Sequence, residues 1–175
     1  MTTFKTKRLL LRSWTPEDLK PFAALNADPR VMEFFPKTLT RSESDDLARK
    51  IQIEIDEKGF GLWAVQISNI CPFIGFVGLH SVDFMPGIEI GWRLSYEHWG
   101  KGYAFEAATE VVRFAFEDLQ LPELISFTYK GNYRSRGLME KLGMTRNPQD
   151  DFLNPKLPVN HFLRPHVLYR LSSDP

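Results

Sequence analysis

The chain has 175 residues, enough for one domain spanning 1–175 whose core needs no disulfide or metal to hold it. Its 22 Lys and Arg equal its 22 Asp and Glu, and this zero net charge argues against a nucleic-acid partner. The single cysteine suits a reducing, cytoplasmic location, and the lack of a long apolar run argues against a membrane partner and a signal peptide.

The first part of the chain predicts one strand and two helices. The apolar run at 9–11, inside 4–14, is short enough for a strand. Thr-Pro-Glu-Asp at 15–18 has the form of a helix start, and that helix is expected to end by residue 28. Thr-Arg-Ser-Glu at 40–43 is a capping box, which opens a helix that ends near Gly59 and carries an apolar stripe of Leu47, Ile51 and Ile55.

Alternating apolar residues predict strands in the middle of the chain. The segments 63–67, 73–79 and 88–94 are joined by short turns and predict an antiparallel meander. Helical spacing returns over 102–119, and the remaining expected elements are a strand at 124–129, a helix at 132–142 and a strand at 167–171. The Pro- and Asn-rich stretch between the last two is interpreted either as a binding loop or lid, or as a disordered segment.

The most informative segment for function is the glycine-rich turn at 99–104, Trp-Gly-Lys-Gly-Tyr-Ala. It leaves an apolar strand and opens a helix, so several backbone N–H groups converge at the positive end of the helix dipole, which suits a phosphate or pyrophosphate. It is not a nucleotide P-loop, because Ser95 stands where that motif needs its first glycine, nor a dinucleotide motif, because Phe105 replaces the third glycine. The alternative is a strand–helix connection that binds no ligand.

Together with its neighbours, this turn resembles the acetyl-CoA motif of the GNAT superfamily of N-acetyltransferases. The residues that carry the resemblance are Ile90-Gly91-Trp92-Arg93-Leu94, Trp99-Gly100-Lys101-Gly102-Tyr103-Ala104 and Glu106-Ala107. Shorter segments resemble the ribosomal-protein N-terminal acetyltransferase (RimJ/RimL-like) branch, at 8–12, 28–31, 74–78, 132–144 and 166–169. Trp99 departs from the wider superfamily pattern, which has Gln or Arg there. The resemblance implies an α+β fold (an α/β sandwich), with a central, mostly antiparallel and splayed sheet flanked by helices.

The resemblance also implies where acetyl-CoA lies. The pyrophosphate would contact main-chain amides of the glycine-rich turn, which consists of Trp99, Gly100, Lys101, Gly102, Tyr103 and Ala104. The pantetheine arm would follow the preceding strand, in a splay against 124–129, and the thioester carbonyl would be polarised by the backbone near Trp92, Arg93 and Leu94. Asn132, an N-cap by its own chemistry, and Ser135 are expected to contact the pantetheine and its sulfur.

Acetyl transfer needs an unprotonated amine, and two side chains are candidates for the general base. Glu89 is the first, because it alternates away from the apolar face of its strand just before the acyl site; its alternative role is an ion pair with Arg93. His80 on the neighbouring strand is the second, against the alternative of a structural histidine. A dedicated base is also dispensable, since an α-amine with a pKa of about 7.7–8.0 is partly neutral at pH 7.

The leaving thiolate needs a proton. Many superfamily members supply it from a tyrosine, but Met139 stands at the matching position here and has no proton to donate. Ser135 is therefore the candidate for a hydrogen bond to the sulfur, against the alternative of an ordinary serine in the first turn of a helix. Cys71, placed in a turn beside Pro72, has no basic neighbour in sequence and is not expected to carry an acyl group.

The sequence thus predicts an acetyl-CoA-dependent N-acetyltransferase that moves the acetyl group directly to a primary amine. By resemblance, the acceptor is the N-terminal amine of a protein or peptide, and Phe34 or Phe35 is expected to line its cleft. The alternatives are a small amine, such as a polyamine, an amino acid or an aminoglycoside antibiotic, and a CoA-binding module without catalysis. The expected partners are acetyl-CoA and an amine, with no metal, and the chain is expected to be a monomer or a homodimer.

Overall fold

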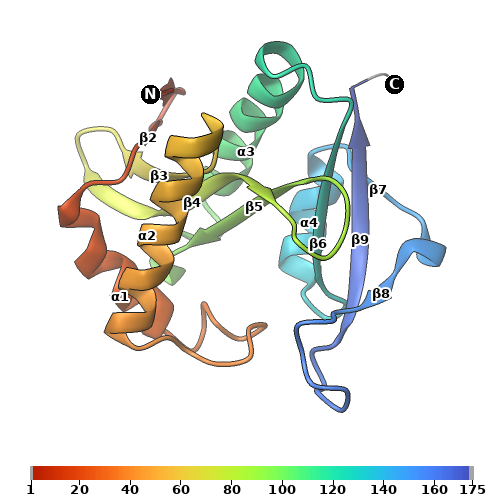
Figure 1. Ribbon diagram of the computed structural model, residues 1–175. Helices are drawn as coiled ribbons and strands as arrows, with labels where there is room; N and C mark the ends of the chain where they lie inside the picture. Colours follow the sequence, from red (N-terminus) through yellow and green to blue (C-terminus); the bar gives the residue numbers. More distant parts are fainter. Residues whose placement is uncertain (1, 174–175) are drawn as a thin grey trace.

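The computed structural model describes residues 2–173, which form nine strands and four α-helices (Figure 1). One sheet contains every strand, in the order β1-β2-β3-β4-β5-β6-β9-β7, with β8 also paired to β9. The strands are β1 (Phe4–Lys5), β2 (Leu9–Arg12), β3 (Leu62–Ile67), β4 (Cys71–Ser81), β5 (Ile88–Leu94), β6 (Glu123–Tyr129), β7 (Thr145–Arg146), β8 (Phe152–Leu153) and β9 (Pro165–Ser172). All neighbours are antiparallel except β5 and β6, which confirms the predicted α+β class and the largely antiparallel sheet.

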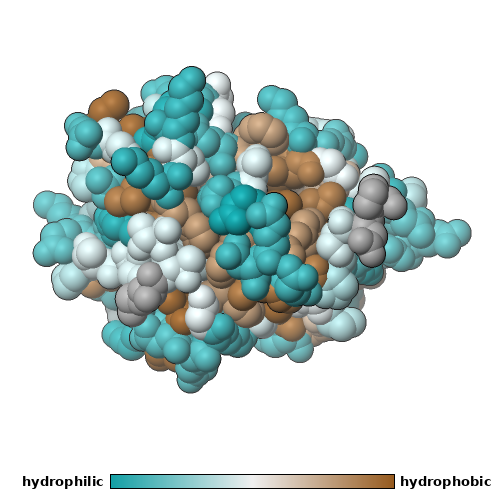
Figure 2. Space-filling model, turned by 90° about the horizontal axis from the view of Figure 1, so that it is seen from above, coloured by the Kyte–Doolittle hydropathy of each residue, from teal (hydrophilic) through white to brown (hydrophobic). Residues whose placement is uncertain are grey.

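The helices cover both faces of this sheet (Figure 1). They are α1 (Leu19–Ala27), α2 (Arg41–Lys58), α3 (Tyr103–Arg113) and α4 (Tyr133–Lys141). Alternation along β3 separates the two layers: Val65 packs in one core cluster with residues of α3 and α4, whereas Ala64 packs in the other with residues of α1 and α2. The view from above shows apolar side chains in a band across the middle of the molecule, between polar margins (Figure 2).

Helix α2 shows how local sequence sets an element. The backbone N–H of Glu43 donates to Thr40 Oγ1 at 3.3 Å, and Glu43 Oε2 accepts from the Thr40 N–H at 2.9 Å, as the predicted capping box requires. Gly59 ends the helix with a φ of +73°, a left-handed conformation that favours glycine. Ile51 and Ile55 of the predicted stripe are buried.

Several elements differ from the expectation. The strands β1, β7 and β8 have two residues each, too few for an alternating pattern to reveal them. Cys71 is not in a turn: it is the first residue of β4 and pairs in register with Ile67. The stretch before β9, for which disorder was one interpretation, contains β7 and β8, and its loop over 154–164 is closed by a hydrogen bond from the Asn154 N–H to the Arg164 carbonyl at 2.8 Å.

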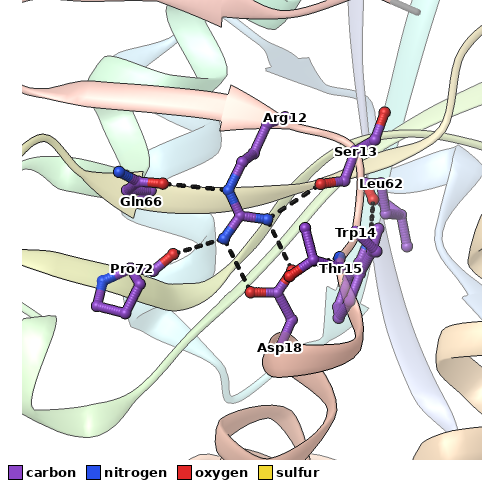
Figure 3. A network of polar contacts seen from close by, with 8 residues as sticks. All are labelled: Arg12, Ser13, Trp14, Thr15, Asp18, Leu62, Gln66 and Pro72. Carbon is purple, nitrogen blue, oxygen red and sulfur yellow. Dashed lines mark hydrogen bonds and ion pairs between the residues drawn. The ribbon is translucent and has the colours of Figure 1, made fainter.

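A buried charge pair joins the start of α1 to the sheet (Figure 3). Both Nη atoms of Arg12, at the end of β2, donate to the Asp18 carboxylate, at 2.7 and 2.8 Å. The same guanidinium donates to the carbonyls of Ser13 and Pro72 and to Gln66 Oε1. Asp18 is 1% exposed and also accepts from the Thr15 N–H at 2.8 Å. The carboxylate therefore caps the helix start and fixes it against β2, β3 and β4.

None of the helices formed by residues 2–173 is both long and apolar enough to cross a membrane.

Candidate active site

A cavity of about 910 Å³ opens where β5 and β6 diverge. The two strands share only one register pair, Glu89 with Ile125, and beyond it the splay separates them. Ser126 Oγ of β6 donates to the Ile90 carbonyl of β5 at 2.9 Å, so the strands remain tied at the closed end of the splay. Residues from β4, β5, β6, the start of α3, α4 and the segment after α1 line the cavity, a size and setting typical of a small-molecule site.

The glycine-rich turn forms one wall of this cavity. Gly100 and Gly102 have φ angles of +72° and +81°, which a side chain would strain, and Gly102 is the N-cap of α3. The carbonyl of Lys101 accepts from Arg8 Nη1 at 2.9 Å, and Arg8 Nε donates to Glu106 Oε2 at 2.6 Å. The ion pair between Arg8, in the turn before β2, and Glu106 of α3 thereby fixes the glycine-rich turn in a conformation that opens the N-terminus of a helix toward the cavity, where an anion is favoured.

The rest of the predicted turn contributes unequally. Gly100, Gly102, Tyr103 and Ala104 line the cavity, but Lys101 does not. Trp99 lines it too, and its indole Nε1 donates to the Leu94 carbonyl at 2.8 Å, while the Arg134 guanidinium lies 4.4 Å from its ring centroid. Trp99 therefore connects the end of β5 with α4 through its ring.

The N-terminus of α4 forms a second wall. Asn132 is the N-cap of this helix: its Oδ1 accepts from the Ser135 N–H at 3.2 Å, and its Nδ2 donates to Thr128 Oγ1 at 3.0 Å. Asn132 and Ser135 both line the cavity. Met139, by contrast, is 1% exposed and packs in the core, so a side chain at this position does not reach the cavity in this structure.

Two titratable side chains lie side by side on β4 and β5 and line the cavity. Glu89 pairs in register with His80, and its carboxylate makes no hydrogen bond or ion pair with any residue from 2 to 173. Burial raises its pKa to about 8, against a smaller opposing effect of the His80 charge. His80 Nδ1 lies 2.6 Å from Glu54 Oε2 of α2, and this hydrogen bond raises the pKa of the imidazole. His80 therefore favours its charged form, whereas Glu89 favours its neutral form.

Arg93 lies on the same face of β5 as Glu89, but the two do not form the ion pair that was one interpretation of their spacing. Arg93 Nη1 instead donates to Asn26 Oδ1 of α1 at 2.6 Å. The guanidinium lies over Phe35, 4.1 Å from the ring centroid, and 5.3 Å from that of Phe76. Burial lowers the pKa of Arg93 to about 10.

The remaining predicted positions divide into those at the cavity and one away from it. Trp92, Arg93, Leu94, Phe34 and Phe35 line it, and Phe34 stacks on Tyr129 with 5.8 Å between ring centroids. Cys71 does not line it; its Sγ donates to the Phe73 carbonyl at 3.4 Å. In residues 2–173 there is no group of three or more His, Cys, Asp and Glu side chains that could hold a metal ion.

Sequence reasoning missed Glu54 and Asn26, the partners of His80 and Arg93. Both lie on helices, far along the chain from the residues they contact. Glu54 directly precedes Ile55, the last residue of the apolar stripe of α2. Only the packing of that helix against the sheet brings Glu54 to His80 of β4. The loop residues Asn154 and Lys156 also reach the cavity, as the binding-loop interpretation of this stretch expects.

Comparisons with known proteins point to one family. Residues 8–145 match the family model described as an acetyltransferase (GNAT) domain. The FsC-acetyl coenzyme A-N(2)-transacetylase of Aspergillus fumigatus is 32% identical over 82% of this chain and 65% of its own length. The crystal structure of an acetyltransferase from Agrobacterium tumefaciens superposes with a TM-score of 0.81 at 26% identity, covering 98% of this chain and 94% of that one. Mycobacterium smegmatis RimJ in complex with CoA-disulfide shares the fold, with a TM-score of 0.79 at 16% identity over 98% and 87% of the two chains.

Proposed function

Because this chain belongs to the GNAT family of acetyltransferases, whose members acetylate amines from acetyl-CoA, we propose that it acetylates the N-terminal α-amine of a peptide or protein by direct transfer, with Glu89 as general base. The acceptor would enter along the side of β4 and β5 that carries His80, Glu89 and Arg93. Acetyl-CoA would enter along the glycine-rich turn and α4. The splay of β5 and β6 lets the two substrates meet.

In the proposed reaction, the amine nitrogen attacks the thioester carbonyl carbon, and a new C–N bond forms as the C–S bond breaks. The electron pair of that bond leaves with the sulfur as a thiolate, which takes up a proton from water to become the free thiol. Glu89 accepts the proton that the nitrogen loses. Ser135 is positioned at the N-terminus of α4 to donate a hydrogen bond to the departing sulfur, and its hydroxyl lines the same cavity.

Electrostatics favour Glu89 over His80 as the base. His80 Nδ1 lies 2.6 Å from the Glu54 carboxylate, which raises the pKa of the imidazole and favours its charged form. Glu89 would act as the base in its ionised form, and burial makes that form a stronger proton acceptor. The Glu89 carboxylate has no partner among the described residues that would compete for the proton. The charge of His80 beside it limits how far the pKa of Glu89 rises.

The observation that carries the choice of acceptor is the Glu89 carboxylate, which lines the cavity without a hydrogen bond or ion pair to any residue from 2 to 173 and whose pKa burial raises to about 8. An α-ammonium has a pKa of about 7.7–8.0, so proton transfer to Glu89 is nearly balanced. A lysine ε-ammonium, at about 10.4, would make the same transfer unfavourable by more than two pKa units. The site therefore suits an α-amine better than a lysine side chain.

The placement of acetyl-CoA predicts the effect of Gly102→Asp. This change puts a side chain at a φ of +81° and a carboxylate at the N-terminus of α3, where the pyrophosphate is proposed to lie. We expect affinity for CoA to fall by at least about 100-fold, since a buried like-charge contact costs several kcal/mol. Calorimetry on the folded variant measures it. Gly59→Asp is the matched control, because Gly59 also has a positive φ (+73°), an added Cβ there meets nothing within 4 Å, and the residue does not line the cavity. An unchanged affinity in folded Gly102→Asp contradicts this placement.

Release of thiol from acetyl-CoA in the presence of a panel of amines tests the proposed function. The panel contains short peptides with free N-termini, the same peptides with blocked N-termini and one lysine, and small amines that include a polyamine, an amino acid and an aminoglycoside. Release with the free N-termini alone supports the proposal. Release with the small amines alone assigns the chain to small-amine acetylation, and tight CoA binding without any release identifies a CoA-binding module.

A further inference from the structure

We propose that Arg93 anchors a carboxylate of the acceptor, several bonds away from the amine that is acetylated. This inference rests on the proposed function, because it takes the side of the cavity that carries Glu89 as the acceptor side. It adds a recognition element that specifies which peptides or amines are substrates.

The first step is the incomplete bonding of the guanidinium. An arginine side chain offers five N–H donors. Among the residues that the structure describes, Arg93 has one hydrogen-bond acceptor, Asn26 Oδ1, which its Nη1 contacts. Its Nε is buried and has no partner among residues 2–173. Two aromatic rings, Phe35 and Phe76, provide attraction to a cation but accept no conventional hydrogen bond.

The second step is the missing counter-charge. Three arginines line the cavity, and the other two have carboxylate partners: Arg30 pairs with Asp28 at 2.6 Å and Arg134 with Glu33 at 2.8 Å. Arg93 has no carboxylate within 4.0 Å in the described part of the chain. Buried charges in proteins are generally paired, because an unpaired one costs several kcal/mol of desolvation. A carboxylate brought by the acceptor would supply the pair and match the flat geometry of the guanidinium.

The third step is the spacing of the two functional side chains. Glu89 and Arg93 are four residues apart on one face of β5, which places their Cα atoms roughly 13 Å apart. An amine held at Glu89 and a carboxylate held at Arg93 therefore belong to different parts of an extended molecule. The acidic side chain of a peptide, one or two residues after the N-terminus, fits this separation better than the carboxylate of a free α-amino acid.

The experiment compares acceptors that differ only in a carboxylate. Peptides of the form Ala-Glu-Ala and Ala-Ala-Glu, all with amidated C-termini, are measured against the same peptides with Gln, and free alanine against alaninamide. Thiol release gives kcat/KM for each. For the wild type we expect Glu to be preferred over Gln by about 10- to 100-fold in at least one peptide position, the value of one charge-assisted hydrogen-bonded pair.

Two variants test whether Arg93 causes this preference. Arg93→Met keeps an unbranched chain over the two rings and removes the charge, so the Glu-to-Gln ratio is expected to fall below about threefold. Asn26→Asp puts a carboxylate where the amide oxygen now lies, 2.6 Å from Arg93 Nη1, and is expected to abolish the ratio while the protein remains at least as stable. The Ser44 hydroxyl, 2.9 Å from Asn26 Nδ2, can turn to donate to the new carboxylate. Arg49→Met, at an exposed arginine paired with Asp46, is the matched control and should keep the wild-type ratio.

The outcomes separate the two proposals. If Glu and Gln peptides react equally well in the wild type, or if the preference survives in Arg93→Met, the carboxylate anchor is wrong while peptide acetylation stands. If alanine is preferred over alaninamide and Arg93→Met removes that preference, Arg93 binds a carboxylate next to the amine, and the proposed anchor for a distant carboxylate is wrong. If no member of the panel reacts, the proposed function fails and the anchor fails with it.

Discussion

Two half-buried arginines, Arg12 and Arg93, have opposite electrostatic surroundings in the same sheet. Arg12 donates to a carboxylate, two carbonyls and an amide oxygen, and its hydrogen bonds to Asp18 raise its pKa above the ordinary value. Arg93 has one hydrogen-bond acceptor, and burial lowers its pKa to about 10. The charge and hydrogen-bond donors of Arg12 are matched by partners within the fold. Those of Arg93 would be matched only when a molecule from outside binds.

The difference shows that one part of the sheet, around Arg12, stabilises the fold, whereas another part, along β5, is available to bind a substrate. Around Arg12 the charged groups have partners at short distance, at 2.7 and 2.8 Å between its Nη atoms and the Asp18 carboxylate, so this region holds the fold together. Along β5, Glu89 and Arg93 are half-buried in the cavity wall and pair with no opposite charge among residues 2–173, so their ionisation depends on what enters the cavity. Unpaired charge in a cleft reduces the stability of the protein and increases its ability to recognise a substrate.

The largest expected effect, on the stability of the protein, comes from removing the carboxylate partner of Arg12. Asp18→Asn leaves Arg12 buried without its carboxylate, and the free energy of unfolding should fall by about 3–5 kcal/mol. Denaturant unfolding measures this loss. Asp46→Asn, in an exposed pair with Arg49, is the control and should change stability by less than about 1 kcal/mol. A loss as small in Asp18→Asn would remove the contrast between the two arginines.

The next largest effect is expected at Glu89, in the unpaired region along β5. Glu89→Gln should lower turnover by about 100-fold or more, the usual contribution of a general base. Its effect on stability should have the opposite sign. The folded pKa of Glu89 lies above its ordinary value, so the wild-type protein loses stability as the pH rises from about 4.5 to about 8. The Glu89→Gln variant has no carboxylate to ionise there and does not lose this stability.

Melting curves at pH 5 and pH 8.5 check the second half of this prediction. The two proteins should melt together at the lower pH, and the variant should melt higher at pH 8.5. A variant that is slower and also less stable at pH 8.5 indicates a structural role for Glu89 instead of a base.

The smallest effect is expected at the thiol. Ser135→Ala removes one hydroxyl from the first turn of α4 and leaves the Asn132 cap intact, since the cap uses the backbone N–H of residue 135. We expect kcat to fall about tenfold and the affinity for acetyl-CoA to change less than twofold, because the hydrogen bond to sulfur matters most as charge develops. Steady-state kinetics and calorimetry measure the two. Equal losses would make Ser135 a binding contact only.

Local patterns predicted most of the frame. The capping box of α2, the alternation of β3 to β5 and the glycine-rich turn each depend on residues a few positions apart, and each lies where the sequence predicts. The side chains proposed for the site could be predicted to share strands and helix ends for the same reason. To expect them at one cavity, it was enough to know that the strands at 88–94 and 124–129 lie next to each other and splay apart, which the family resemblance implied.

Partnerships across long separations could not be predicted. The spacing of Glu89 and Arg93 is compatible with an ion pair. Arg93 instead donates a hydrogen bond to Asn26, on a helix that packs over β4. Glu54 reaches His80 only because α2 lies across the same face. Asp18 was predicted as part of the helix start, in the third position after Thr15. Its bond to Arg12 depends on the path of the loop between β2 and α1, which no periodicity encodes.

The single register pair between β5 and β6 has a consequence for the whole molecule. A sheet joined at its centre by so little backbone pairing has a seam there, and amide hydrogens along both edges are open to exchange with water wherever no partner covers them. A substrate lodged in the seam touches strands from both halves at once and stabilises the assembled form by mass action. Occupancy is therefore expected to appear as slowed hydrogen exchange in β5 and β6 together, although about thirty residues of chain separate them.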